Sequence, residues 1–246
     1  WAHVGTKRSY AIRLCDAIDR NREPHICGPL TFAEAPGQIA GCTTRHRIST
    51  NSMTDFATIV ACGGTAERFG ADKRQEALGG QTLLERAIAK AAAYGGPVAL
   101  AVRERAHAPE THLPVLVDPQ DDLGPIGALA SGFDFAETSG CAQVLLIACD
   151  QPFLPTDLPR RLSHALGDAG VALPVSAGHD QNMAGLWRCD RQALDAYLAS
   201  GQRSLWGFAE QVGIARVEWD DQGADPFADI DTQADLSAAQ ARIIEE

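Results

Sequence analysis

The 246-residue sequence has no uninterrupted apolar run of eighteen or more residues, which argues against a transmembrane helix. It has no excess of basic residues either: 21 Lys and Arg stand against 32 Asp and Glu, a net charge of −11. A broad nucleic-acid interface needs a basic face, so we expect no nucleic-acid partner. Because no apolar run is long enough to span a bilayer, we expect no membrane partner either. An anionic ligand would have to be held by a local concentration of positive charge.

Two further patterns are missing. The seven cysteines include no C-x-x-C pair and no zinc-binding spacing, which indicates reduced, mostly buried thiols and predicts a cytoplasmic protein. Neither the G-x-x-x-x-G-K-[ST] motif of P-loop proteins nor the G-x-G-x-x-G motif of dinucleotide-binding proteins is present. Any phosphate-binding loop in this chain must therefore be of another type.

The first 52 residues differ from the rest in charge, with seven Lys and Arg against four Asp and Glu, and they show no sustained hydrophobic period. We predict that residues 1–52 form a poorly ordered extension. A transit peptide is the alternative, although the four acidic residues argue against it. From residue 54 onward, apolar runs alternate with amphipathic stretches, which predicts one α/β domain over residues 54–246.

Within that domain, near-continuous apolar runs joined by amphipathic stretches predict a mostly parallel sheet with helices on both faces. Thr82 and Glu85 form a capping-box pattern at the start of the first predicted helix. The predicted strands are 56–61, 97–102, 114–118, 143–150, 171–175, 183–187 and 215–219. The predicted helices are 82–96, 124–137, 155–167, 190–201, 204–213 and a last one after Thr232.

Polar features follow three of these strands at the point where each strand ends. A glycine-rich loop follows the first strand, Asp118 follows the third and Asp150 follows the fourth. Ligands of open α/β sheets bind at the carboxyl ends of the strands. We therefore expect these three features to share one edge of the sheet.

The loop after the first strand, "ACGGTAERFGADK", combines glycines with positive charge. Gly63 and Gly64 carry no Cβ, so the backbone can turn sharply and approach a ligand closely. Arg68 and Lys73 follow, and their side chains are suited to phosphate oxygens: Arg can bind two oxygens at once, and Lys acts as a compact charge. Glycine-rich turns are often purely structural, so the loop by itself fits both an anion site and a structural turn.

Five segments in order resemble the molybdenum cofactor guanylyltransferases, the MobA-like family of NTP transferases. The loop is similar to L-A-G-G-x-S-x-R-M-G-x-D-K, and "DPQDDLGPIGALASG" is similar to D-x-x-x-x-x-G-P-L-x-G, matching at Asp118, Gly124, Pro125 and Gly127. "ACDQPFLP", "GQRSLWGF" and "FADIDTQADL" resemble the family's C-D-x-P-F, G-x-R-S-L and F-x-N-I-N-T-P-E-D-L segments. The resemblance implies a Rossmann-like, three-layer nucleotidyltransferase fold over residues 54–246.

The resemblance also implies a reaction. A terminal phosphate of molybdopterin would attack the α-phosphorus of GTP, GMP would be transferred and pyrophosphate would leave, with Mg²⁺ as cofactor. GTP and molybdopterin would be the small-molecule partners, with transient contacts to cofactor-biosynthesis or acceptor proteins. The implied catalytic residues are Lys73, Arg68 and Asp150, and Asp150 is the implied metal ligand, while Asp118 either assists the metal directly or binds the nucleotide. The implied nucleotide-binding residues are Ala61, Cys62, Gly63, Gly64, Lys73, Asp118 and Asp150, with backbone N–H groups of the loop around the triphosphate.

The chain departs from the family pattern in the acceptor region and near its end. Gln181 and Asn182 replace a His-Pro pair, and they either line the acceptor site or cap a strand. Asp229 and Asp231 stand where the family segment has Asn. Arg203 either reaches the acceptor phosphate or is a solvated charge. Three alternatives stay open: a cytidylyltransferase for the same cofactor, a sugar- or polyol-phosphate nucleotidyltransferase, and a non-catalytic nucleotide-binding partner in cofactor insertion.

Overall fold

The computed structural model describes residues 55–63, 73–120, 123–220 and 223–245. All of them belong to the compact unit Thr50–Glu246. The predicted extension over residues 1–52 lies outside the described residues, as do Gly64 and Arg68. Within the described ranges, no helix is both long and apolar enough to cross a membrane.

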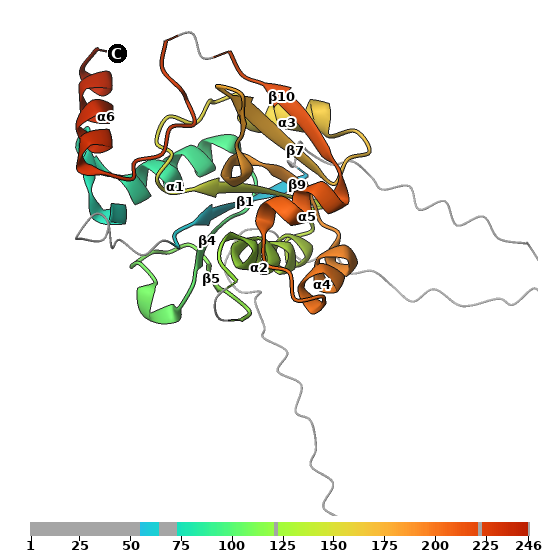
Figure 1. Cartoon of the computed structure of the whole chain (residues 1–246). Coiled ribbons are helices and arrows are strands. Elements are labelled where there is room, and N and C mark those ends of the chain that lie inside the picture. Colours follow the sequence, from blue (N-terminus) through green and yellow to red (C-terminus); the bar gives the residue numbers. More distant parts are fainter. Residues whose placement is uncertain (1–54, 64–72, 121–122, 221–222, 246) are drawn as a thin grey trace, which may run out of the picture. The chain divides into compact units, whose positions relative to one another are not determined.

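The core of the fold is an eight-stranded sheet (Figure 1). Seven strands lie in the order β10-β7-β9-β6-β1-β4-β5, and β8 pairs with β7. The sheet is mostly parallel, as predicted; β9 runs antiparallel between β6 and β7, and β8 is antiparallel to β7. The strands are β1 (Phe56–Ala61), β4 (Val98–Val102), β5 (Val115–Val117), β6 (Gln143–Ala148), β7 (Val171–Ser176), β8 (His179–Asp180), β9 (Leu186–Arg188) and β10 (Ile214–Glu218).

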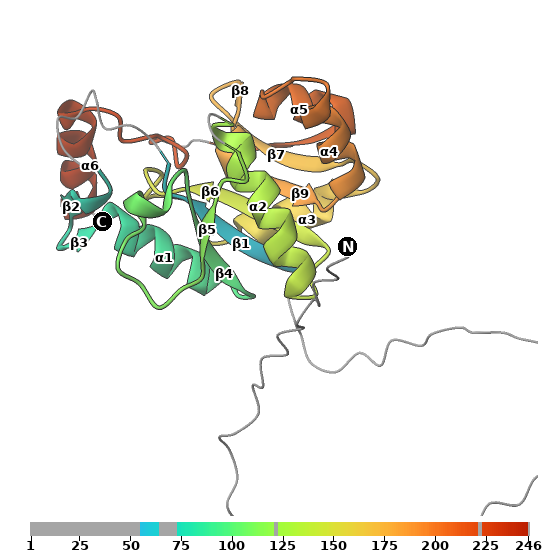
Figure 2. The same cartoon turned by 90° about the horizontal axis from the view of Figure 1, so that it is seen from below.

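Helices cover both faces of this sheet. Along β1, Ile59 packs into a core with α2, α4 and α5, whereas Val60 packs into a second core with α1 and α3. This alternation follows from the pleat, because successive side chains of a strand point to opposite faces. Figure 2 shows α2 lying over the sheet. The helices are α1 (Leu83–Tyr94), α2 (Pro125–Thr138), α3 (Leu158–Leu166), α4 (Arg191–Ala199), α5 (Leu205–Val212) and α6 (Gln233–Glu245).

Local sequence sets the helix starts that position the site. The Thr82 hydroxyl accepts a hydrogen bond from the Glu85 amide at 3.1 Å, and the Glu85 carboxylate accepts one from the Thr82 amide at 2.8 Å. The predicted capping box is thus present at the start of α1. Helix α2 begins with Pro125, and the preceding Gly124 has φ 64°, a left-handed conformation that favours glycine.

A small third hydrophobic cluster joins the segment that follows Lys73 to the C-terminal part of the described chain. Strands β2 (Ala77–Leu78) and β3 (Gln81–Thr82) form a hairpin just after Lys73, and α6 packs on it. Leu78 of the hairpin and Ile230, which precedes α6, are both buried in this cluster. In Figure 1, α6 stands beside the start of α1. The chain that leads into α6 is thereby fixed next to the segment that carries Lys73.

The packing of α2 on β1 gives a stability prediction. Ile59 is fully buried, and a Cβ added at Gly132 of α2 would lie 2.9 Å from its Cγ1, so helix and strand approach closely. Ile59→Ala should lower the free energy of unfolding by about 2–5 kcal/mol, because it leaves a cavity at this contact. Ile244→Ala is the control, since Ile244 is 81% exposed, and it should change stability by less than about 0.5 kcal/mol. Urea unfolding measures both; equal effects would contradict this packing.

Candidate functional site

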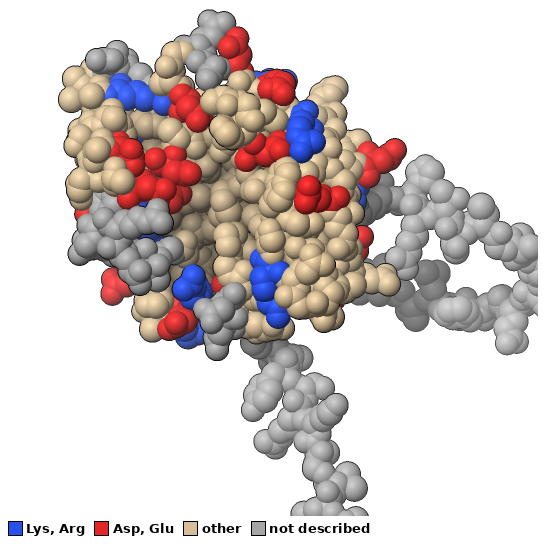
Figure 3. All heavy atoms as spheres, in the orientation of Figure 1, with Lys and Arg blue, Asp and Glu red and all other residues tan. Residues whose placement is uncertain are grey.

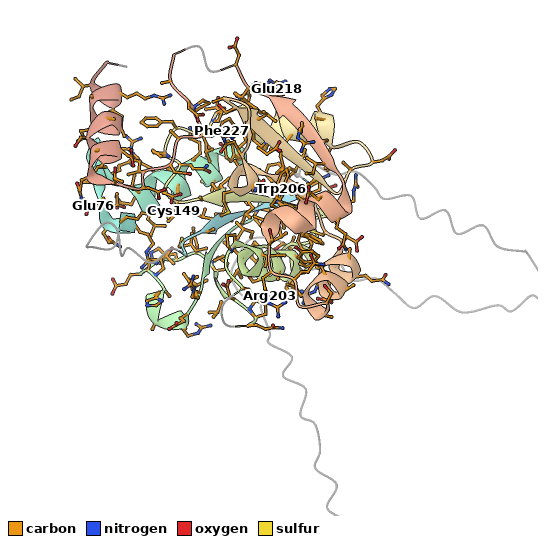
Figure 4. The ribbon with its side chains drawn as sticks, viewed as in Figure 1. Glu76, Cys149, Arg203, Trp206, Glu218 and Phe227 are labelled. Carbon is orange, nitrogen blue, oxygen red and sulfur yellow. The ribbon has the colours of Figure 1, made fainter. Side chains whose placement is uncertain are left out.

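The carboxyl ends of four parallel strands meet at one edge of the sheet. Because β6, β1, β4 and β5 are parallel neighbours, the residues that follow them share this edge: Asp150 after β6, Gly63 after β1, Arg103 after β4 and Asp118 after β5. The structure therefore places Gly63, Asp118 and Asp150 along one edge, as the sequence predicted. Figure 4 shows Cys149, the residue before Asp150, at this edge.

The edge carries an ion cluster centred on Lys73. The Lys73 ammonium lies 2.5 Å from Asp150 Oδ2 and 2.9 Å from Asp231 Oδ1, and it donates a further hydrogen bond of 3.3 Å to the Ile230 carbonyl oxygen. The side chains of Lys73 and Asp150 are only 16% and 19% exposed, whereas that of Asp231 is 57% exposed. Burial alone would lower the pKa of Lys73, but the hydrogen bonds and charges of Asp150 and Asp231 raise it well above its ordinary value.

The segment before α6 closes one side of this cluster. The Ile230 amide donates to the Asp150 carbonyl oxygen at 3.0 Å, and the Gln151 side-chain amide donates to the Phe227 carbonyl oxygen at 3.1 Å. Asp229 adds another carboxylate. Its pKa is raised to about 6, because the surrounding protein removes part of its hydration and because Asp150 and Asp231 lie nearby.

Asp118 lies away from this cluster, in an open pocket at the other end of the same edge. Three strand-to-strand steps, from β6 to β5, separate it from Asp150, a spacing of roughly 14 Å at about 4.8 Å per step. A Cβ at Gly127 would lie 2.7 Å from the Asp118 carboxylate, so this carboxylate needs a glycine in the first turn of α2. The other lining residues include Ala61, Gly63, Arg103, Gly124 and Met183.

The charge state of Asp118 reflects its position. Burial raises the pKa of Asp118 to about 6, and the nearby Arg103 guanidinium partly offsets this. Arg103 was not found by sequence reasoning, because "RERAHAPETH" is a polar stretch in which no single cation stands out. Its place directly after an apolar strand was the signal that could have found it.

One N–H group of the predicted backbone cradle, that of Cys62, is already hydrogen-bonded within the sheet. The Cys62 amide donates to the Ala101 carbonyl oxygen at 2.8 Å, and the Ala61 carbonyl oxygen accepts from the Cys149 amide at 3.2 Å. The Cys62 N–H is therefore engaged within the sheet and not free for a phosphate. Of the predicted loop residues, Ala61 and Gly63 line the pocket. Cys62 and Cys149 are buried and free, as expected for packing residues.

The residues that the sequence suggests for an acceptor site differ in their contacts. Arg203, labelled in Figure 4, donates to the carbonyl oxygens of Leu198, in the last turn of α4, and of Gln202, at 2.8 and 2.7 Å. The Asn182 side-chain oxygen is buried without a hydrogen-bond partner, and the adjacent Met183 lines the Asp118 pocket. A buried amide oxygen without a partner is a place where a ligand donor could bind.

The chemistry of the edge suits a metal–phosphate ligand better than a metal alone. No group of three or more His, Cys, Asp or Glu side chains within the described ranges could hold a metal ion. Mg²⁺ needs only one or two carboxylates when phosphates and waters complete its octahedron, and Asp150 meets that requirement. Figure 3 shows acidic side chains gathered beside α6, around a hollowed and largely uncharged surface. A bound cation would reduce this excess of negative charge.

Comparisons with known proteins agree with this arrangement. Residues 58–216 match the family model of the MobA-like NTP transferase domain. The chain is 35% identical to a molybdenum cofactor guanylyltransferase of Acidiphilium cryptum over 195 residues, which are 77% of this chain and 96% of that protein. It is 36% identical to one of Rhodopseudomonas palustris over 200 residues, 76% and 92% of the two chains.

A solved structure shows the same fold. Molybdopterin-guanine dinucleotide biosynthesis protein A from Archaeoglobus fulgidus has a TM-score of 0.65 and 17% identity, and the match covers 77% of this chain and 100% of that one. The predicted three-layer fold with a mostly parallel sheet is thereby confirmed.

The raised pKa of Asp118 predicts how stability depends on pH. Its folded-state pKa of about 6 exceeds the ordinary value of 3.8, so the stability it contributes at low pH is lost as pH rises from about 4 through 6. Asp118→Asn removes the ionised group and should raise the free energy of unfolding at pH 7.5 by about 1 kcal/mol, allowing for solvent screening. Urea unfolding at pH 4, 6 and 7.5 checks this. A gain that persists at pH 4 would contradict the electrostatic explanation.

Proposed function

The chain belongs to the MobA-like NTP transferase family, and from this membership we propose that it transfers GMP from GTP to molybdopterin with release of pyrophosphate. The observation that carries the proposal is the meeting of Lys73 and Asp150 at the edge where the parallel strands end. A cation and a carboxylate there can act on the same phosphate group. The similarity to curated molybdenum cofactor guanylyltransferases supports the choice of substrates.

Both substrates are anions, so the main task of the protein is to neutralise charge and to align the reacting groups. Lys73 would bind oxygens of the triphosphate, and its raised pKa keeps it charged at any physiological pH. Catalysis of this type rests on positioning and on charges fixed before the reaction begins. Arg68 is proposed as the second cation of the loop, by resemblance of its sequence.

Asp150 would hold the Mg²⁺ ion, which supplies neutralisation of phosphate charge when it is bound. One oxygen of Asp150 contacts Lys73, so this carboxylate can hold the lysine and a metal ion at the same time. A carboxylate with phosphate and water oxygens favours Mg²⁺, Mn²⁺ or Ca²⁺ over softer divalent ions, and Mg²⁺ is proposed among these by resemblance to the family.

Asp118 is proposed to bind the nucleoside and not the metal. Three strand-to-strand steps separate it from Asp150, and this spacing favours separate ligands for the two carboxylates. The Watson–Crick edge of guanine presents two adjacent N–H donors, and a carboxylate can accept both. Gly63 and Gly124 also line the pocket and place no side chain in it, and a Cβ built at either one would meet no atom within 4 Å. This arrangement favours GTP over CTP, whose base offers a single amino donor at that edge.

The test is pyrophosphate release with molybdopterin, Mg²⁺ and either GTP or CTP at equal concentration. We expect release with GTP and at least about tenfold slower release with CTP, because a carboxylate left with an unmatched partner costs about 1–3 kcal/mol. Faster release with CTP would favour the cytidylyltransferase alternative. Tight nucleotide binding without any release would favour the non-catalytic partner. The cytoplasmic location and protein partners expected from the sequence stay predictions.

Substitution of Asp150 tests the metal assignment. Asp150→Asn keeps the side-chain shape but removes the negative charge, so Mg²⁺-dependent pyrophosphate release should fall about a hundredfold or more, equivalent to about 3 kcal/mol. The fold should persist, because Asp231 still contacts Lys73. Asp195→Asn on α4 is the charge-matched control and should retain activity. Activity of Asp150→Asn close to that of the control would remove Asp150 from the reaction.

A further inference from the structure

Every hydrogen atom of the Lys73 ammonium already has an acceptor within the protein. The group has three N–H donors, and its three contacts are the Asp150 carboxylate, the Asp231 carboxylate and the Ile230 carbonyl oxygen. A triphosphate oxygen can therefore bind Lys73 only if one of these contacts is given up. In the nucleotide-free protein, the Lys73 ammonium therefore has no N–H left to donate to an anion, although its side chain is partly exposed to solvent.

Of the three contacts, the one to Asp231 is the easiest to release. Asp150 is mostly buried, and the Ile230 carbonyl is fixed because the Ile230 side chain is 2% exposed and its amide donates to the Asp150 carbonyl oxygen. The Asp231 side chain is 57% exposed, so rotation about its own bonds moves the carboxylate into water without a change in the backbone.

The backbone around Asp231 is held independently of Lys73. The Asp235 carboxylate accepts hydrogen bonds from the amides of Asp231 and Thr232, at 3.1 and 2.8 Å, and so fixes the turn that leads into α6. Loss of the Asp231 carboxylate would leave this turn in place. The family segment that residues 227–236 resemble has Asn at this position, which is the same shape without the charge.

We propose that Asp231 occupies Lys73 in the nucleotide-free protein and yields it to the triphosphate of the incoming nucleotide. Asp231 is thus a positioning residue that sets nucleotide affinity, and it is neither a ligand of the nucleotide nor a participant in bond making. This inference rests on the proposed nucleotide-binding role of Lys73. Because Asp231 competes at the phosphates, its effect is independent of the base.

The experiment measures binding and not turnover. The full-length wild type and Asp231→Asn are titrated calorimetrically with GTP and with inorganic tripolyphosphate, both in EDTA. Asp231→Asn should bind both ligands about fivefold more tightly, which corresponds to the upper range for loss of one exposed ion pair. The control is Asp195→Asn, which removes an equal charge from a side chain that is also 57% exposed and ion-paired, with Arg191. It should leave both affinities unchanged.

A second pair of variants tests whether the effect passes through Lys73. In the Lys73→Ala background, Asp231→Asn should lose most of its fivefold gain, because no ammonium remains to be released. An equal gain in both backgrounds would overturn the proposal, since Asp231 would then act only as a repelling charge. Unchanged or weaker binding by Asp231→Asn would overturn it as well, and weaker binding would identify Asp231 as a ligand.

The outcome is separable from that of the proposed reaction. If wild-type protein binds GTP but releases no pyrophosphate with molybdopterin, the guanylyltransferase proposal fails, while the affinities of Asp231→Asn still decide the role of Asp231. If Asp231→Asn binds as the wild type does and pyrophosphate release is normal, only the role of Asp231 is lost.

Discussion

The ion pair between Lys73 and Asp150 is the interaction on which the site depends. It joins residues 77 positions apart, one at the end of the loop after β1 and the other after β6. These strands are direct neighbours, with Ala61 paired to Ala148, so the parallel register delivers both segments to one edge. Both side chains are mostly buried, and loss of Lys73 would leave the Asp150 carboxylate without this cation, which is far more costly than the pair itself, whereas loss of Asp150 would leave Lys73 paired with Asp231. The pair therefore fixes Lys73 beside the carboxyl end of β6 in the nucleotide-free protein.

The parts of this arrangement that follow from local sequence could be predicted. Runs such as 56–61 and 143–148 are apolar on both faces, which only a strand covered on both sides tolerates, and parallel strands of that type end at a common edge. The capping box of Thr82 and Glu85 marks the start of α1 without reference to the rest of the fold. Together these rules predict that Asp118, Asp150 and the start of the glycine loop lie at one edge of the sheet.

The parts that depend on distant contacts could not be predicted. An apolar run does not indicate which strand it will pair with, or whether the pairing is parallel or antiparallel. Strand β9, for example, lies antiparallel between β6 and β7. The contact of Lys73 with Asp231 spans 158 positions, and it forms because Ile230 is buried beside the β2–β3 hairpin. The engagement of the Cys62 amide by Ala101 is likewise a matter of strand pairing, so the loop sequence alone overstated the number of free N–H groups.

Each half of the edge holds a carboxylate whose ionisation is unfavourable, and the cause differs between the two halves. Near Lys73, carboxylates outnumber the ammonium, and the pKa of Asp229 is raised to about 6. In the pocket, burial raises the pKa of Asp118 to about 6 although Arg103 is close. A raised carboxyl pKa means that stability is lost as pH rises through that value, so at neutral pH both halves are less stable than uncharged equivalents would be. Ionisable side chains with shifted pKa values of this kind are found more often at functional sites than elsewhere in proteins. A metal–nucleotide complex bound as proposed would bring cations to one half and N–H donors to the other, and it would relieve both costs at once.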